Sequence, residues 1–320
     1  MKKELYMQLG FPEIRDVSGR HSIVDLYRSK RTGIYLLHFP DNTYYVGQAV
    51  DVVRRFAQHL KQKGPVKGIS FMPVAKSRLN QTEQLCIGAL EEHCILKNIA
   101  LVSSPVQESD IDDVISPSEQ QVWLDTLARP AYHKRISDEN LKLRYAEKFK
   151  NLCSDEFFMN KSLPVFQKYM QYCIPETFKT EISFWGCSCL PGYSGKDVQI
   201  YSRLNIYWQE VFTSGRDKIK NTPVFSFHCT ASDVVDNPRQ LAEWQRKFKT
   251  FTVSDHYYIP GGRDQCNPCL SSTEETLEIL DDPSFISAVK KFNLRNMRKG
   301  AEVYSRYHCL DLAALILGKS

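Results

Sequence analysis

Five polar or aromatic residues in the first third of the chain are spaced so that a fold could bring them together: Tyr35, Tyr45, Arg55, His59 and Glu83. Tyr35 and Tyr45 belong to two apolar runs separated by a short polar segment, so they can be neighbours across a hairpin. Arg55 and His59 are four residues apart, which places them on one side of a helix. Such groups could hydrolyse a phosphodiester, a reaction that needs a base for water, a cation for the phosphate charge and a carboxylate-bound metal.

At these positions the sequence resembles the GIY-YIG nuclease family. The first signature of the family is here Gly33-Ile34-Tyr35, and the second is Tyr45-Val46-Gly47, with valine in place of the usual isoleucine. Four further positions follow in the order and spacing of the family: Arg55, His59, Glu83 and Asn98. The resemblance covers residues 31–100, less than a third of the chain. It implies an α+β domain with a small three-stranded antiparallel sheet flanked by helices.

The resemblance also implies a role for each position. Tyr35 or Tyr45 would activate the attacking water, with His59 as an alternative base or a relay. A tyrosine with the usual pKa of about 10 is a weak base near neutral pH, so it needs a cation nearby. Arg55 would hold the scissile phosphate with its planar guanidinium, and Glu83 would bind one Mg²⁺ or Mn²⁺ ion.

Two residues would support this site. Asn98 would orient or steady it, and Gly47 would let the backbone turn or approach closely after the second strand. Each position also has an interpretation without chemistry. Glu83 and Asn80 have the spacing of a helix capping box, the tyrosines could be ordinary strand aromatics, and Arg55 with His59 could form a solvated helix face.

The elements expected around these residues alternate in a simple order. Two β-rich runs at 33–39 and 43–47 predict a hairpin, because Pro, Asp and Asn separate them. Asp51 can cap a helix that Gly64-Pro65 ends. A third strand is expected at 69–75, at an edge because of Pro73. Asn80 and Glu83 then open a second helix that runs to about Lys97, with Leu85, Leu90 and Ile95 among its apolar positions.

The composition changes over Ser103–Pro117, which is acidic and contains Pro and Ser, as a linker or domain edge would. We therefore expect a nuclease-like domain at 1–115 and a mixed α/β domain of unknown fold at 116–320. Helices are predicted at 118–128, 137–153, 160–175, 236–249 and 283–306, and strands at 181–185, 198–208 and 223–229.

Two weaker signals lie in the second part. The pairs Cys187/Cys189 and Cys266/Cys269 could hold a structural Zn²⁺, although 76 residues separate the pairs and unrelated buried thiols are the alternative. The segment 290–306 is basic, and its cations could follow a DNA backbone if they are not simply a solvated helix face: Arg295, Arg298, Lys299 and Arg306.

The 320-residue composition is typical of globular proteins and excludes a disordered, collagen-like or coiled-coil chain. There is no apolar run long enough to span a bilayer and no secretory signal at the N-terminus, so we expect a cytoplasmic protein with reduced thiols and no membrane partner. Through Val106 the chain has 15 Lys and Arg against 9 Asp and Glu, and the remainder has 27 against 28. The excess positive charge in the first third is suited to a polyanion.

These observations together predict a metal-dependent endonuclease that acts on nucleic acid, with double-stranded DNA as the expected substrate. The second domain would recognise the target, for example in phage defence, restriction or mobile-element biology. Two alternatives remain: a non-catalytic nucleic-acid-binding or regulatory protein on the same fold, and a toxin or effector nuclease.

Overall fold

The computed structural model describes residues 1, 3–99, 101–103, 105, 108–127, 135, 138–194, 196–256 and 258–318. The chain divides into two compact units, Met1–Gln107 and Glu108–Ser320, called unit 1 and unit 2 below. The division falls inside the acidic segment 103–117. Each unit has its own buried apolar core. A separate function for each unit stays a prediction.

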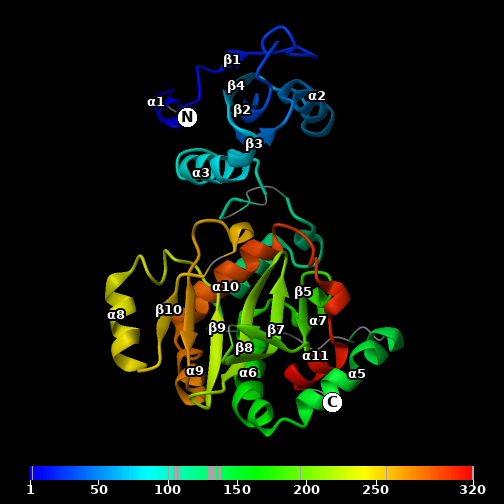
Figure 1. Ribbon diagram of the computed structural model, residues 1–320, viewed down its shortest axis with the longest axis vertical. Helices are drawn as coiled ribbons and strands as arrows, with labels where there is room; N and C mark the ends of the chain where they lie inside the picture. The colour runs from blue at the N-terminus through cyan, green and yellow to red at the C-terminus, as the bar shows by residue number, and fades with distance from the viewer. Residues whose placement is uncertain are drawn as a thin grey trace. The chain divides into compact units, whose positions relative to one another are not determined.

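Unit 1 is an antiparallel sheet between helices (Figure 1). The strand order is β1-β4-β2-β3, so the expected three-stranded sheet is present and the two-residue β1 extends it. The strands are β1 (Arg15–Asp16), β2 (Gly33–His38), β3 (Tyr44–Ala49) and β4 (Gly68–Pro73), and the helices are α1 (Lys3–Gln8), α2 (Val52–Lys63) and α3 (Leu79–Glu91), with a 3-10 turn η1 (Lys76–Arg78) before α3.

The hairpin β2–β3 forms as the sequence predicts. Its turn is closed by the Phe39 N–H, which donates to the Thr43 carbonyl at 2.9 Å, and Asn42 adopts a positive φ of 60°. Side chains alternate between the two faces of the sheet. Ile34 and Leu36 pack in the core with α3, whereas Tyr35 and Leu37 pack in the core with α2. The hairpin therefore turns Tyr35 toward the helix that carries Arg55 and His59.

Helix α2 also begins and ends where expected. The Asp51 carboxylate accepts hydrogen bonds from the backbone N–H groups of Val53 and Arg54, at 2.9 and 3.2 Å. The helix ends at Gly64, whose φ of 82° is easily adopted only by glycine.

Helix α3 differs from its prediction at both ends. It begins at Leu79 after a 3-10 turn, and Asn80 does not cap it: its side-chain oxygen accepts instead from Gln48 Nε2 at 2.7 Å. The predicted capping box is therefore wrong. The helix ends at Glu91 and not near Lys97, and Leu85 is exposed, because only one face of α3 packs against the sheet.

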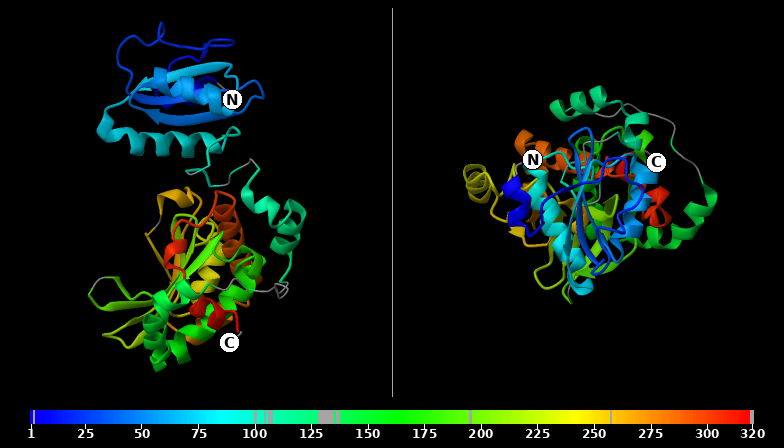
Figure 2. Two further views of the ribbon diagram at one scale, coloured as in Figure 1. Left: turned by 90° about the vertical axis from the view of Figure 1, so that its right-hand side faces the viewer. Right: turned by 90° about the horizontal axis from the view of Figure 1, so that it is seen from above.

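Unit 2 contains a larger, wholly antiparallel sheet in the order β10-β11-β9-β8-β7-β5, with β6 paired to β7. Figures 1 and 2 show the sheet and its helices. The strands are β5 (Trp185–Ser188), β6 (Gly192–Ser194), β7 (Val198–Ile206), β8 (Gln209–Asp217), β9 (Thr222–Phe227), β10 (Thr252–Ser254) and β11 (Asn267–Leu270).

Helices of unit 2 pack against one face of this sheet. Tyr169 stacks on Phe212 of β8 at 4.7 Å between ring centroids, and Phe285 meets Phe227 of β9 edge to face at 5.4 Å. The helical elements are α4 (Pro117–Asp125), α5 (Glu139–Cys153), α6 (Leu163–Cys173), α7 (Thr177–Thr180), α8 (Pro238–Lys247), α9 (Thr273–Ile279), α10 (Pro283–Met297) and α11 (Leu310–Ile316), with η2 (Asp110–Asp113), a π-helical turn η3 (Phe158–Ser162), η4 (Ile259–Gly261) and η5 (Ser305–Tyr307).

The sequence predicted part of this unit. The strand expected at 181–185 begins only at Trp185, and the sequence does not predict the strands β6, β8, β10 and β11. The helix expected at 283–306 stops at Met297, before Gly300 with its φ of 142°. The predicted helices at 118–128 and 137–153 extend in part onto residues outside those the structure describes. Among the described residues, no helix has the length and apolar character needed to cross a membrane.

Candidate active site

Tyr35 lies at the centre of a polar cluster in unit 1. Its hydroxyl lies 2.7 Å from His59 Nε2, and the Arg55 Nε–H donates to it at 3.2 Å. Tyr35 and His59 are each 1% exposed, whereas Arg55 is half-buried and also donates to the Gln58 side chain at 3.2 Å. The cluster thus extends from the core to the surface along α2.

Tyr45 lies on the more exposed side of the same cluster. Its ring stacks on Tyr35 at 6.2 Å between centroids and lies 4.8 Å from the His59 ring. The Lys63 ammonium stands over the Tyr45 ring, 4.8 Å from its centroid. Arg55, His59 and Lys63 follow at intervals of four residues, so one side of α2 presents all three to the phenols.

Gly47 is required by the closeness of these rings. It lies opposite Tyr35 in the β2–β3 register. A Cβ at Gly47 would stand 2.3 Å from the Tyr35 hydroxyl oxygen and 2.9 Å from the Tyr45 ring. No side chain fits there without displacing the phenol, which explains glycine at this point of the second signature.

Glu83 approaches the site from α3, at the edge of the sheet. Its Oε1 accepts from the backbone N–H of Gln48 at 3.1 Å, and its Oε2 accepts from Gln48 Nε2 at 2.9 Å. Each oxygen keeps further lone-pair capacity. The carboxylate is close enough to both phenols to raise their pKa values, so it belongs to the same cluster.

Asn98 does not touch the phenols but holds the strand that carries Tyr45. Its Oδ1 accepts from the Val46 N–H at 3.0 Å, and its Nδ2 donates to the Val46 carbonyl at 2.7 Å. On the same edge, two residues earlier, the backbone groups of Tyr44 form hydrogen bonds with residues 95 and 97. Two residues later, the backbone N–H of Gln48 donates to Glu83. Three successive sets of hydrogen bonds, at Tyr44, Val46 and Gln48, therefore satisfy the backbone along the outer edge of β3.

Burial dominates the electrostatics of the cluster. It raises the pKa of Tyr35 and of Tyr45, the former strongly, and the Arg55 guanidinium only partly opposes this. Burial, with help from Arg55 and Lys63, lowers the pKa of His59 to about 4, so its imidazole is neutral at pH 7. Burial also raises the pKa of Glu83, against the hydrogen bonds from Gln48.

The donor set fits a hard divalent ion held mainly by non-protein ligands. Mg²⁺ commonly takes one or two carboxylates and completes its shell with water and phosphate oxygens. Glu83 supplies one partly accessible carboxylate whose raised pKa an adjacent cation would lower again. In the described part of the chain, no group of three or more His, Cys, Asp or Glu side chains could hold a metal.

The four cysteines proposed for zinc do not form one site. Cys187 belongs to β5 and Cys269 to β11, with β7, β8 and β9 between them. Strands are spaced about 4.8 Å apart, so the two pairs are separated by roughly 19 Å across the sheet. Cys266 instead has its Sγ 3.4 Å from that of Cys229. The geometry excludes a single ion on these thiols, and their sequence spacing alone could not show the intervening strands.

The basic segment 290–306 is likewise not a continuous cationic face. Arg295 pairs with Asp264, Arg298 pairs with Asp112 at 2.6 Å, and the buried Lys299 donates to the Pro260 carbonyl at 2.6 Å. Of the four cations named for a DNA backbone, Arg306 is the exposed one. The predicted role is therefore wrong for the other three, because internal acceptors already use them.

Comparisons with protein-family models, with curated proteins and with solved structures found no match for this chain.

Two residues of the site are not identified by the sequence analysis. Gln48 follows directly after the second signature, and Lys63 continues the four-residue spacing of Arg55 and His59. Both signals were present, but only the packing of α2 and α3 on β3 shows that these side chains face the phenols.

Proposed function

We propose that unit 1 is a metal-dependent nuclease that hydrolyses phosphodiester bonds, with DNA as the first substrate to test. The observation that carries this proposal is the convergence of Tyr35, Tyr45, Arg55, His59 and Glu83 from one hairpin and two helices on one partly open cluster. The resemblance to GIY-YIG nucleases and the positive charge of the first third support the same reaction.

Tyr45 is the better placed of the two phenols to activate water. Tyr35 is buried and its hydroxyl is already engaged by Arg55 and His59, whereas Tyr45 is partly exposed. Its raised pKa makes it a poor base by itself. Positive charge from Lys63, from Arg55 and from a bound ion would favour its ionised form.

Tyr35 and His59 form a buried hydrogen-bonded pair. Arg55 donates to the Tyr35 hydroxyl oxygen, so the phenol can direct its own proton to Nε2 of the neutral His59. Nδ1 of His59 is buried and has no hydrogen-bond partner among the described residues. We assign His59 the role of holding Tyr35 in place and not that of a relay, because a base with a pKa of about 4 does not take a proton from a phenol whose pKa is raised, and its Nδ1 has no acceptor among those residues to which a proton could pass.

Arg55 would bind the reacting phosphate directly, and Glu83 would act on it through the metal ion. One outer nitrogen of Arg55 donates to the exposed Gln58 side chain, so the guanidinium extends to the surface, where its planar fork could hold two phosphate oxygens. Glu83 would hold the metal ion. When bound, the ion would supply positive charge to the phosphate oxygens and lower the pKa of a bound water.

The test measures whether the full chain cleaves nucleic acid in the presence of Mg²⁺ or of EDTA. The substrates are supercoiled, linear and single-stranded DNA, and RNA. We expect cleavage with Mg²⁺ and none with EDTA. Glu83→Gln keeps the shape of the side chain but loses its charge, so cleavage should fall to below about one hundredth of the wild-type rate.

Glu92→Gln is the matched control, because Glu92 is an exposed carboxylate at the end of the same helix. It should cleave as the wild type does. Undiminished cleavage by Glu83→Gln, or cleavage that continues in EDTA, would contradict the assignment of the site. Binding of DNA without cleavage under any condition would favour the non-catalytic alternative.

A further inference from the structure

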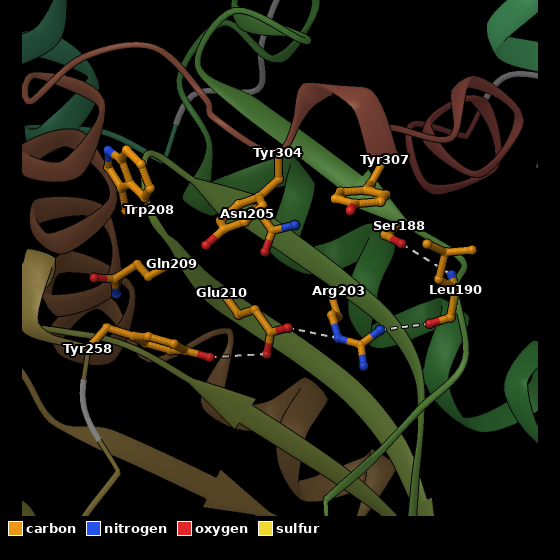
Figure 3. A pocket seen from close by; sticks show the side chains of 10 residues that line it. All are labelled: Ser188, Leu190, Arg203, Asn205, Trp208, Gln209, Glu210, Tyr258, Tyr304 and Tyr307. Atoms are coloured by element: carbon orange, nitrogen blue, oxygen red, sulfur yellow. Dashed lines mark hydrogen bonds and ion pairs between the residues drawn. The ribbon is translucent and has the colours of Figure 1, made fainter.

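Unit 2 has a pocket of about 270 Å³ on one side of its sheet (Figure 3). Leu204 and Ile206 of β7 belong to the helical core, so Arg203 and Asn205, which alternate with them, face the opposite side, where the pocket lies. Small-molecule pockets usually measure about 300–1,000 Å³, so this pocket is suited to a single ring system.

Aromatic side chains form much of the pocket wall: Trp208, Tyr258, Tyr304 and Tyr307. They come from the β7–β8 turn, from the segment before η4 and from the segment around η5, so three separate parts of the chain supply them. Trp208 is 50% exposed at the rim, an unusual position for so large an apolar side chain. Flat aromatic walls offer stacking partners to a planar ligand.

An amide without a partner points into this pocket. Asn205 is only 7% exposed, and its side chain makes no hydrogen bond to any described residue. Figure 3 shows the amide directed toward the centre of the pocket, between Tyr304 and Glu210. An asparagine amide offers a donor and an acceptor side by side, which matches the hydrogen-bonding edge of a nucleobase.

The charged residues of the pocket neutralise each other. Arg203 Nε pairs with Glu210 at 2.8 Å, and Arg203 also donates to the Leu190 carbonyl at 2.7 Å. The Tyr258 hydroxyl donates to the other oxygen of Glu210 at 3.2 Å. Because the carboxylate is already paired, the site favours an uncharged ring over a cation such as a quaternary ammonium group.

Positive charge lies beside the pocket. The exposed Arg306 guanidinium stands over the ring of Tyr307, 4.6 Å from its centroid. The exposed Arg144 donates to the Arg306 carbonyl at 3.2 Å, which brings a second cation to the same place. Two arginines next to an aromatic pocket could bind the phosphates on either side of a base.

We infer that this pocket binds a single nucleobase turned out of a nucleic-acid strand, with Asn205 reading its edge and Trp208 stacking on it. The inference deepens the proposed function and rests on it, since it makes unit 2 the part that selects where the nuclease binds. A free nucleotide has the same chemistry, so the test must separate the two sources.

The experiment measures binding by the full chain in EDTA, so that cleavage plays no part. The probes are a 25-base-pair duplex, the same duplex with one mismatch, and the four deoxynucleoside monophosphates. Turning out a base costs least at a mismatch. We expect the mismatched duplex to bind about tenfold more tightly than the paired duplex, and the monophosphates to bind far more weakly.

Asn205→Leu and Trp208→Ala should each abolish the preference for the mismatch and leave binding of the paired duplex within about twofold. Asn151→Leu is the matched control in a second, smaller pocket, and it should keep the preference. Thermal unfolding of each variant checks its folding; Trp208→Ala covers the case in which Asn205→Leu does not fold, because Trp208 is half exposed.

Three outcomes would overturn the inference. These are equal binding of the two duplexes by the wild type, a mismatch preference that survives Trp208→Ala in a folded protein, and tight binding of monophosphates without any mismatch preference, which would make the ligand a free nucleotide. Failure of the nuclease itself would appear separately, as absence of cleavage with Mg²⁺ while the mismatch preference is still measured.

Discussion

The candidate site of unit 1 and the basic segment 290–306 of unit 2 use their cations in different ways. In unit 1, neither Arg55 nor Lys63 forms an ion pair with a described carboxylate, and both face the phenols of the candidate site. In unit 2, Arg298 and Arg295 pair with aspartates, and the buried Lys290 donates to the carbonyls of Trp123 and Thr126. A count of Lys and Arg therefore indicates a binding surface only where internal acceptors do not neutralise them.

The same contrast holds for buried acids and bases. The polar cluster of unit 1 opens to the surface through Tyr45, Arg55 and Glu83. In unit 2, Glu181 is wholly buried, paired with Arg135 at 2.6 Å and 3.1 Å from His308 Nε2. We expect the first arrangement to serve chemistry and the second to serve stability, and this difference can be measured.

The largest effect on stability is expected from Glu181→Gln. It removes the buried negative charge that faces Arg135 and leaves that cation only neutral acceptors, which should cost unit 2 about 3–5 kcal/mol. All four tryptophans lie in unit 2, so urea unfolding followed by tryptophan fluorescence reports on that unit alone. Glu278→Gln, which breaks an exposed pair with Lys247, is the control and should cost less than about 1 kcal/mol.

DNA cleavage by Glu181→Gln, measured below its unfolding transition, should stay within about twofold of wild type. A parallel loss of cleavage and stability would show that the two units do not have separate roles.

A pH effect of similar size is expected from Glu302 in unit 2. Burial raises its pKa to about 8, and its Oε2 has no partner among the described residues. Between an unfolded pKa near 4.3 and about 8, the folded chain holds the proton more tightly than the unfolded chain, so stability falls as the pH rises and levels off above 8. The loss from pH 5 to 8 should be about 3 kcal/mol.

Glu302→Gln removes this titration. Urea midpoints at pH 5, 6.5 and 8 should then fall less in the variant than in wild type. The same slope in both proteins would mean that Glu302 ionises normally in the folded chain.

In unit 1, Arg55→Lys should act on turnover. Lysine keeps the charge but loses the planar fork and the hydrogen bond to Tyr35, so we expect kcat to fall about 100-fold and DNA affinity to change little. Arg54→Lys, at the exposed neighbouring position, is the control. A loss of affinity at unchanged kcat would place Arg55 in general DNA binding.

The smallest of these effects is expected from Asn98→Ala, which removes both hydrogen bonds to Val46. Unit 1 should lose about 1–3 kcal/mol, because the two backbone groups of Val46 are buried. Hydrogen exchange at the Val46 amide should accelerate accordingly, while kcat falls less than in Arg55→Lys. Loss of kcat without faster exchange would instead make Asn98 part of the chemistry.

Local sequence signals predicted unit 1 well where the cause is local. The hairpin at 33–49, the Asp51 cap and the Gly64 end of α2 follow from turn and cap chemistry between residues close in sequence. The capping box at Asn80 failed for the opposite reason. Gln48, which is 32 residues from Asn80, forms hydrogen bonds with the side chains of Asn80 and Glu83, so these side chains do not cap the helix.

The sequence by itself determined that Tyr35 lies in a hairpin strand and that Arg55 and His59 lie on one side of a helix. It therefore showed that these three side chains could come together. Tertiary structure decided their ionisation, since burial raises the pKa of the phenols and lowers that of His59. It also placed three strands between the cysteine pairs and gave carboxylate partners to Arg295 and Arg298. The spacing of residues along the chain determines which contacts are possible within one helix or between two adjacent strands. Burial and ion pairing depend instead on elements that come together only when the chain folds.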